Sequence, residues 1–174
     1  MRIAFCMMNT NRDASKPGAA RGNSAGRLAS RATVQFFLET AELLSRAVNA
    51  DTVTGLIFLG IISANTRHLR PGTPEAQSYA QTETIVPDSL RKGISVHALS
   101  LQVNLPYETT RRHVQKLIND GLCERRDDGI IAPAEALSSP KMMRVLDRNL
   151  ANVFKFVDEL ERGGVLAARR ARGD

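Results

Sequence analysis

Residues 94–133 of the chain read ISVHALSLQVNLPYETTRRHVQKLINDGLCERRDDGIIAP, and this stretch decides the fold. Apolar residues recur at helical spacing over 96–103 and again over 107–120, with a short turn between the two segments. Residues 122–126 and 130–132 then flank an Asp-Gly pair, which is a strong signal for a tight hairpin turn. The sequence therefore predicts two consecutive helices closed by a small β-hairpin.

The turn between the two helices is set by Asn104-Leu105-Pro106. Pro106 fixes its own φ and biases Leu105 toward an extended conformation, which ends one helix and begins the next. Gly121 is expected to end the second helix in a left-handed conformation. The residues expected to face the core are Val96, Leu99 and Val103 in the first helix and Thr110, Val114, Leu117 and Ile118 in the second. With a short strand at 94–95, this order is that of a winged helix-turn-helix, a fold that lays its second helix in the DNA major groove.

The outward face of the 107–120 helix carries three cations and three hydrogen-bonding polar side chains. An arginine can bind O6 and N7 of guanine with two parallel hydrogen bonds, and a glutamine can pair in the same way with adenine. A basic hairpin beside this helix would contact the phosphate backbone. The residues expected to bind DNA are Thr109, Arg111, Arg112, Gln115 and Lys116 on the helix, next to Asn119, and Arg125 and Arg126 on the hairpin.

The charge of the chain supports a polyanionic partner. The 24 Lys and Arg against 18 Asp and Glu give a net charge of +6 and an isoelectric point near 9.9. Seven cations fall between residues 91 and 126 against three acidic residues, which is +4 of that total. These cations are Arg91, Lys92, Arg111, Arg112, Lys116, Arg125 and Arg126. Clustered cations favour DNA because each phosphate contact releases a condensed counterion.

Residues 109–122, TTRRHVQKLINDGL, resemble the recognition helix and first wing strand of bacterial winged-helix transcriptional regulators. The GntR type is the most similar, followed by the MarR and IclR types. The matching positions are Thr109, Arg111, Leu117, Gly121 and Leu122. The resemblance implies DNA contact by Thr109, Arg111 and Arg112, and phosphate contact by Arg125 or Arg126. The sequence departs from the GntR type at Glu108, where that type often has an arginine, and only about 40 residues follow the wing, too few for its effector domain.

Two segments precede the 94–133 stretch and differ sharply in composition. Residues 9–29 are poor in large apolar side chains, and residues 1–29 are expected to form a disordered tail. Ser30 is expected to cap a helix over 30–50, whose apolar residues form one stripe. The residues of the stripe are Val34, Phe37, Ala41, Leu44 and Val48, widened by Phe36, Leu38 and Leu43.

The predicted DNA-binding domain spans residues 51–134. Asp51 or Thr52 caps a helix over 53–68 that is apolar on nearly every side, so other elements must cover it. Residues 69–87 contain three prolines and form a loop, and a short helix is expected over 89–92.

The C-terminal region predicts one long helix over 139–163, begun by Ser139-Pro140, and a basic tail over 164–174. Its apolar residues keep a heptad spacing, typical of helices that pair. The residues at these positions are Met143, Leu146, Leu150, Val153, Val157 and Leu160. We expect the 30–50 and 139–163 helices to form the interface of a homodimer; packing within one chain is the alternative.

Other function classes find little support. His68, His97 and His113 pair with no cysteine or carboxylate at ligand or catalytic spacing, and neither Cys6 nor Cys123 belongs to a metal motif. The sequence predicts no metal, no cofactor, no enzyme and no membrane span, and unpaired thiols fit the cytoplasm. The expected function is a homodimeric transcriptional regulator of double-stranded DNA. The alternatives are a protein-interaction adaptor that uses the winged helix for docking, a winged helix that binds RNA, and a bundle that also binds a small effector.

Overall fold

The computed structural model describes residues 17–69, 72–79 and 84–171, which are mostly helical with one two-stranded sheet. The elements before the first strand are α1 (Pro17–Val48), α2 (Thr52–Thr66), α3 (Pro74–Ser78), the 3-10 helix η1 (Asp88–Leu90), α4 (Val96–Val103) and α5 (Tyr107–Asn119). They are followed by β1 (Glu124–Arg126), β2 (Gly129–Ile131), α6 (Ala134–Leu137), α7 (Pro140–Arg162) and α8 (Val165–Arg170).

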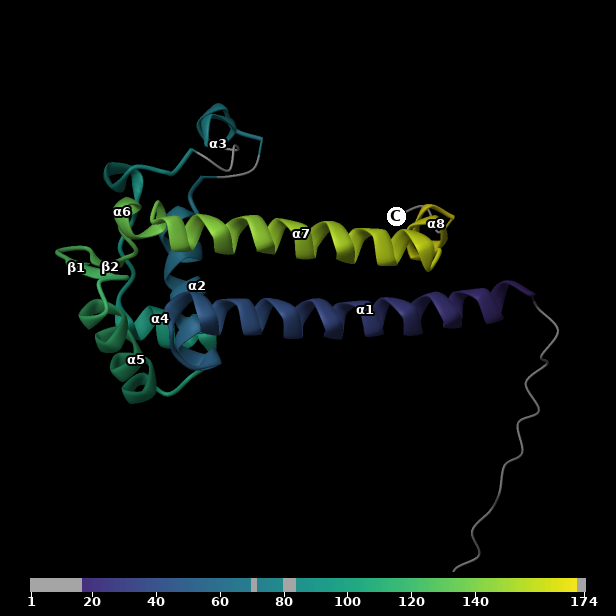
Figure 1. Cartoon of the computed structure of the whole chain (residues 1–174), viewed down its shortest axis with the longest axis horizontal. Helices are drawn as coiled ribbons and strands as arrows, with labels where there is room; N and C mark the ends of the chain where they lie inside the picture. The colour runs from purple at the N-terminus through teal and green to yellow at the C-terminus, as the bar shows by residue number, and fades with distance from the viewer. Residues whose placement is uncertain (1–16, 70–71, 80–83, 172–174) are drawn as a thin grey trace, which may run out of the picture.

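The elements form two groups, which we call the arm and the head (Figure 1). The arm consists of the long helices α1 and α7, which lie side by side, with α8 folded against both at the far end. The head consists of α2, α4, α5 and the β1–β2 hairpin, gathered at the other end of the arm. Helix α2 follows α1 at a bend of 88°. It contacts α1 of the arm as well as α4, α5 and β2 of the head, so it connects the arm to the head.

The head has one apolar core, to which α2, α4, α5 and β2 each contribute. The fully buried large side chains are Ile57, Phe58, Ile61, Leu99, Val114, Leu117, Ile130 and Ile131. In α4, Val96 and Leu99 are buried and Val103 packs against the same cluster. In α5 the buried residues are Thr110, Val114 and Leu117, with Ile118 packed beside them. The inward faces predicted for both helices are therefore confirmed.

The ends of the helices in the head also follow the predicted signals. Asp51 caps α2 by accepting a hydrogen bond from the Thr54 backbone N–H at 2.9 Å. Asn104 ends α4 in the left-handed conformation with φ +53°, and α5 begins directly after Pro106. Gly121 follows α5 with φ +72°, as predicted.

The hairpin pairs β1 and β2 antiparallel, with Arg126 opposite Gly129 and Asp127-Asp128 as the loop. Ile94 adds a bridge on the other side of β2: its N–H donates to the Ile130 carbonyl at 3.1 Å, and the Ile130 N–H donates back at 2.9 Å. Gly129 has φ +136°, and a Cβ there would lie 2.7 Å from the Ile94 backbone, so only glycine fits this close approach.

The side chain of Asn65 joins α2 to the hairpin from within the core. Asn65 is fully buried, and its amide nitrogen donates to the carbonyls of Lys92 at 2.8 Å and Ile130 at 3.1 Å. Its amide oxygen accepts from the Ala132 N–H at 2.9 Å. Three backbone groups of the hairpin region are thus bonded by one side chain of α2.

The contact between α1 and α7, which we call the seam, combines an aromatic pair and an ion pair. Phe36 of α1 stacks on Phe156 of α7 with ring centroids 5.0 Å apart, and Lys155 bonds Glu39 at 2.5 Å. Ser139 caps α7 as predicted, accepting from the Met142 N–H. The predicted heptad residues do not form this seam alone, because several of them stay exposed in the single chain. The exposed ones are Leu146, Leu150 and Val157.

Three predictions at the ends of the chain need correction. Helix α1 begins at Pro17, so the disordered tail predicted over 1–29 is wrong for 17–29, and residues 1–16 lie outside the described part. Ala25 and Ala32 are buried where α1 contacts α7 and α8, because small side chains allow close helix packing. Ser30 is therefore no cap, and its hydroxyl donates to the Gly26 carbonyl within the helix. The predicted basic tail over 164–174 contains α8, which packs on α1 and α7.

The connections are more structured than predicted. Residues 69–87 contain α3, capped by Thr73, and residues 70–71 and 80–83 lie outside the described part. The short helix expected over 89–92 is the 3-10 turn η1 at Asp88–Leu90, and the link before α7 contains α6.

Among the described residues, no single helix has the length and apolar character needed to cross a bilayer, although α1 and α2 taken together as a bent pair meet that test.

Candidate nucleic-acid interface

The outer face of α5 presents the polar residues that the sequence singled out. Arg111, Arg112, Gln115 and Lys116 are exposed, and Thr109 is half-buried at the edge of the face. They lie on the side opposite the buried residues of α5, so the rigid core of the head stands behind them. The structure thus brings the five predicted helix residues together on one surface.

Most of these side chains have partners within the face. Arg111 Nε lies 2.9 Å from Glu108 Oε2, and this hydrogen bond raises the pKa of the guanidinium. Lys116 Nζ lies 2.9 Å from Asp120 Oδ2, and Gln115 donates to Asn119 at 2.9 Å. Arg112 has no hydrogen bond or ion pair with any residue that the structure describes. Among the three cations on this face, Arg112 can therefore bind a ligand without first breaking an ion pair to a carboxylate.

The hairpin places its two arginines in different situations. Arg125 is exposed and, within the described ranges, forms no ion pair. Arg126 Nε lies 2.6 Å from Glu124, and its Nη2 lies 3.1 Å from Asp88 Oδ2 of η1. The hydrogen bond to Glu124 raises the pKa of Arg126. Arg125 is thus the freer of the two for contact with a phosphate.

One cation counted in the local surplus is not on the surface. Arg91 has a side chain only 2% exposed, with Nη2 donating to the Val86 carbonyl at 2.9 Å. Burial lowers the pKa of its guanidinium, while the charge of Asp88 opposes that shift. Arg91, although counted among the seven clustered cations between residues 91 and 126, is therefore not exposed to bind a phosphate.

A hollow of about 360 Å³ lies between the start of α4, the start of α5 and the hairpin. It brings His97 and Tyr107 next to Arg125, and all three are exposed. Tyr107 was not among the residues predicted to bind DNA, although an aromatic residue directly after a helix-starting proline was a usable signal. His97 gave no signal in the sequence, because only folding of the hairpin brings it near Arg125.

His113 connects α5 to α2 rather than facing outward. Its Nδ1 lies 2.8 Å from Thr54 Oγ1 and 4.0 Å from Asp51 Oδ2. The Asp51 carboxylate has a lowered pKa, chiefly because it accepts the Thr54 backbone N–H. His113 therefore links α5 to the N-terminal end of α2.

The described residues contain no group of three or more His, Cys, Asp or Glu placed to hold a metal ion. Cys123 is a buried free thiol next to β1, and burial raises its pKa to about 12. Cys6 lies outside the described residues.

Comparisons with family models, with curated protein sequences and with solved structures find no match to this chain.

Proposed function

We propose that this protein is a sequence-specific DNA-binding transcriptional regulator that acts as a homodimer and performs no catalysis. In this proposal the head is a winged helix-turn-helix, with α5 in the major groove and the β1–β2 hairpin on the sugar-phosphate backbone. The observation that carries the proposal is the outer face of α5, where cations and hydrogen-bonding side chains stand on a helix with a rigid core behind it.

The distribution of charge supports a nucleic acid over a protein partner for this face. From Glu108 onward the exposed α5 residues are polar or charged, and Tyr107 is exposed at the start of the helix, whereas a protein-docking surface is centred on apolar or aromatic anchors. Arg112 and Arg125 are exposed without carboxylate partners among the described residues. Arg112 lies on the helix proposed to contact the bases, and Arg125 lies on the hairpin proposed to contact the DNA backbone.

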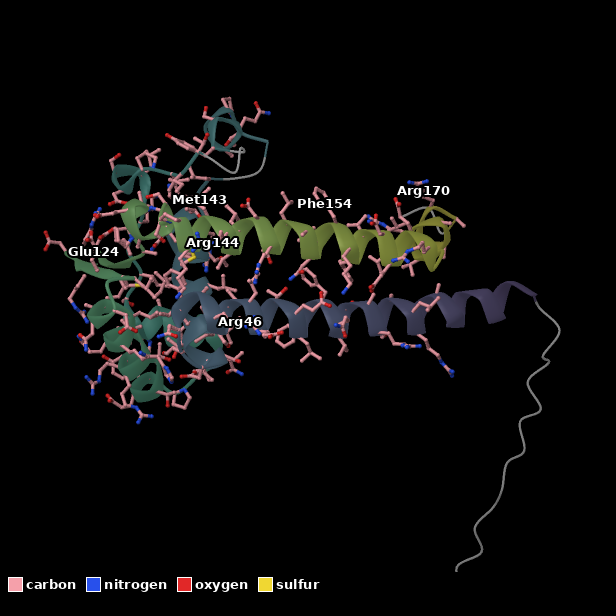
Figure 2. The ribbon with its side chains drawn as sticks, in the orientation of Figure 1. Arg46, Glu124, Met143, Arg144, Phe154 and Arg170 are labelled. Carbon is pink, nitrogen blue, oxygen red and sulfur yellow. The ribbon has the colours of Figure 1, made fainter. Side chains whose placement is uncertain are left out.

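The arm supports the homodimer. Phe37 of α1 is 63% exposed and Phe154 of α7 is 60% exposed, and Phe154 points away from α1 (Figure 2). Exposed apolar residues recur along both helices and on α2, and exposed apolar surface of this kind marks an interaction site. These residues are Val34, Leu38, Leu146, Leu150 and Val157 on the arm, with Val53, Leu56 and Leu59 on α2. A second copy would cover them and place two α5 helices on successive major grooves, about 34 Å apart.

The direct test begins by selecting duplexes from a random library with the full-length chain. Affinity for the selected site is then measured by fluorescence anisotropy at two salt concentrations for the wild type, Arg112→Ala and Arg111→Ala. Each substitution should weaken binding at least about fivefold and broaden the base preference at one position. Arg148→Ala removes the same charge from an exposed position of α7 and should bind as the wild type does. Unchanged affinity in both α5 variants would refute the proposal.

The second candidate function is a protein-interaction adaptor that binds no DNA. It is favoured by Leu101 on α4, which is 70% exposed on the head, together with the apolar surface of the arm. Sedimentation and DNA binding separate the two functions. A monomer without salt-sensitive affinity for duplex DNA would support the adaptor, and a dimer with salt-sensitive affinity would support the regulator.

A further inference from the structure

A cavity of about 680 Å³ lies where the arm meets the head. It is bounded by α1, α2, the start of α7 and the segment around residues 84–86, and most of its wall is apolar. Side chains that line it include Phe36, Leu43, Phe58, Ile62, Val86 and Met143. Its volume falls in the range of pockets that enclose small organic ligands, about 300–1,000 Å³.

Arg91 supplies a buried cation to this wall. The residue is 7% exposed, and its Nε and Nη1 atoms have no hydrogen-bond partner among the described residues. The carboxylate of Asp88 lies 3.4 Å from Nε, close enough for an ion pair but without a hydrogen bond to that atom. Asp88 already accepts bonds from the Ala134 N–H at 2.7 Å and from Arg126 at 3.1 Å, so its oxygens are engaged elsewhere.

A second polar atom in the same wall also lacks a partner. The hydroxyl oxygen of Thr40 is buried and has no hydrogen bond with any described residue. Buried donors without acceptors are rare in native structures, because each loses its hydration without gaining a hydrogen bond. An occupant with an anionic group would offer Nε and Nη1 of Arg91 the acceptor that the described residues do not provide.

We propose that this cavity binds a small organic acid with an apolar or aromatic body, whose carboxylate accepts hydrogen bonds from Arg91 and whose body packs against the apolar wall. A wholly apolar occupant, including an apolar side chain of a second copy, would leave the Arg91 donors without acceptors in a drier environment. A fully polar occupant would bury no apolar surface against the apolar wall of the cavity, so that wall would not stabilise its binding. The site goes beyond the proposed DNA binding and does not depend on it.

The test uses a matched pair of probes, 2-naphthoate and the neutral 2-naphthamide, titrated calorimetrically into the full-length wild type. The acid should bind one site per chain at least about tenfold more tightly than the amide, because a carboxylate pairs its charge with the guanidinium and offers two acceptor oxygens, whereas the amide offers one neutral acceptor. In Arg91→Met the preference for the acid should vanish while weak binding of the amide remains. Arg91→Lys keeps the charge and should keep part of the preference.

Two further variants separate the cavity from general stickiness of the surface. Met143→Trp places a larger side chain in the wall and should weaken both probes together. Leu101→Ser removes the most exposed large apolar side chain, on α4 outside the cavity, and should leave both affinities unchanged. Equal binding of acid and amide by the wild type would overturn the proposal without needing any variant, as would the absence of binding at millimolar probe. Because no DNA enters this titration, failure of the ligand site and failure of DNA binding are scored independently.

Discussion

His113 of α5 and Thr54 of α2 are hydrogen-bonded across the centre of the head, with 2.8 Å between Nδ1 and Oγ1. The Thr54 hydroxyl has one hydrogen. It donates this hydrogen to the Asp51 carboxylate, which can only accept, with 2.9 Å between Oγ1 and Oδ2. Thr54 must therefore accept from His113, which sets the neutral imidazole as the Nδ1–H tautomer. One buried hydroxyl thus ties the N-terminal cap of α2 to the middle of α5.

Replacing Thr54 with valine should destabilise the fold. The substitution keeps the shape of the side chain but leaves His113 Nδ1 without its acceptor, and such a loss costs about 1–3 kcal/mol. Urea denaturation followed by circular dichroism measures the free energy of unfolding. Thr54→Ser keeps the hydroxyl and should lose less stability than Thr54→Val. Wild-type stability in Thr54→Val would show that the hydrogen-bonded chain contributes nothing.

Replacing Glu108 with glutamine should strengthen DNA binding. Glu108 holds Arg111 in an exposed ion pair, and phosphates and base edges must displace that carboxylate. The variant should bind the selected duplex about two- to fivefold more tightly, as expected for the loss of one exposed ion pair. Glu161→Gln, at the far end of α7, removes an equal charge and should change affinity little. Weaker binding by Glu108→Gln than by the wild type would mean that Glu108 positions Arg111 instead of competing for it.

The two hairpin arginines should differ in their effect on salt dependence. Each phosphate contact adds about 0.9 to the slope of log affinity against log salt. Arg125→Ala should therefore lower the slope by about 1, whereas Arg126→Ala should lower it less, because Asp88 and Glu124 already hold Arg126. Anisotropy titrations at four or more salt concentrations give both slopes. The reverse order would assign the backbone contact to Arg126.

Charged substitutions on the outer surface of the arm should produce monomers. Phe37→Asp and Phe154→Asp each place a carboxylate where an apolar contact between copies is proposed, and burying one Phe is worth about 1.5–3 kcal/mol per copy. Analytical ultracentrifugation should show a dimer for the wild type and a monomer for each variant. Leu101→Asp makes the same kind of change on α4 and should remain dimeric. A wild type that sediments as a monomer at high concentration would contradict the dimer.

Cys123 should resist alkylation until the head unfolds. Only the thiolate reacts readily, and a pKa of about 12 leaves almost none at pH 8. Iodoacetamide treatment followed by peptide mass spectrometry should find Cys123 unmodified in the native protein and modified in urea. Rapid native labelling would mean that β1 opens often.

Local signals predicted the head well. The sequence predicted α4, α5 and the hairpin to within a residue or two of their observed bounds. The signals were Pro106, the Asp-Gly pair and the spacing of apolar residues. Each of these signals acts within a few residues of the backbone that it shapes, so the sequence alone carries it.

Features that depend on distant segments could not be predicted in the same way. Helix α1 includes residues before Ser30, where α7 and α8 return beside Ala25 and Ala32, and no local pattern predicts that return. Nothing in the sequence indicated that Arg91 is buried. Its side chain bonds the Val86 carbonyl and lines a cavity shared with α1 and α7 of the arm, and these contacts form only in the folded chain. The five α5 residues of the candidate site were found from their helical spacing, whereas His97 required the tertiary fold.

The Asn65 amide has a consequence for how the hairpin pairs. Strands of three residues carry too few cross-strand contacts to exclude a shifted pairing by themselves. Asn65 requires the carbonyl of Ile130 and the N–H of Ala132 on the same side of the chain, and a slip by one residue would turn both groups away. A buried side chain of α2 therefore selects which residues of the hairpin face outward, and with them the side on which Arg125 meets the solvent.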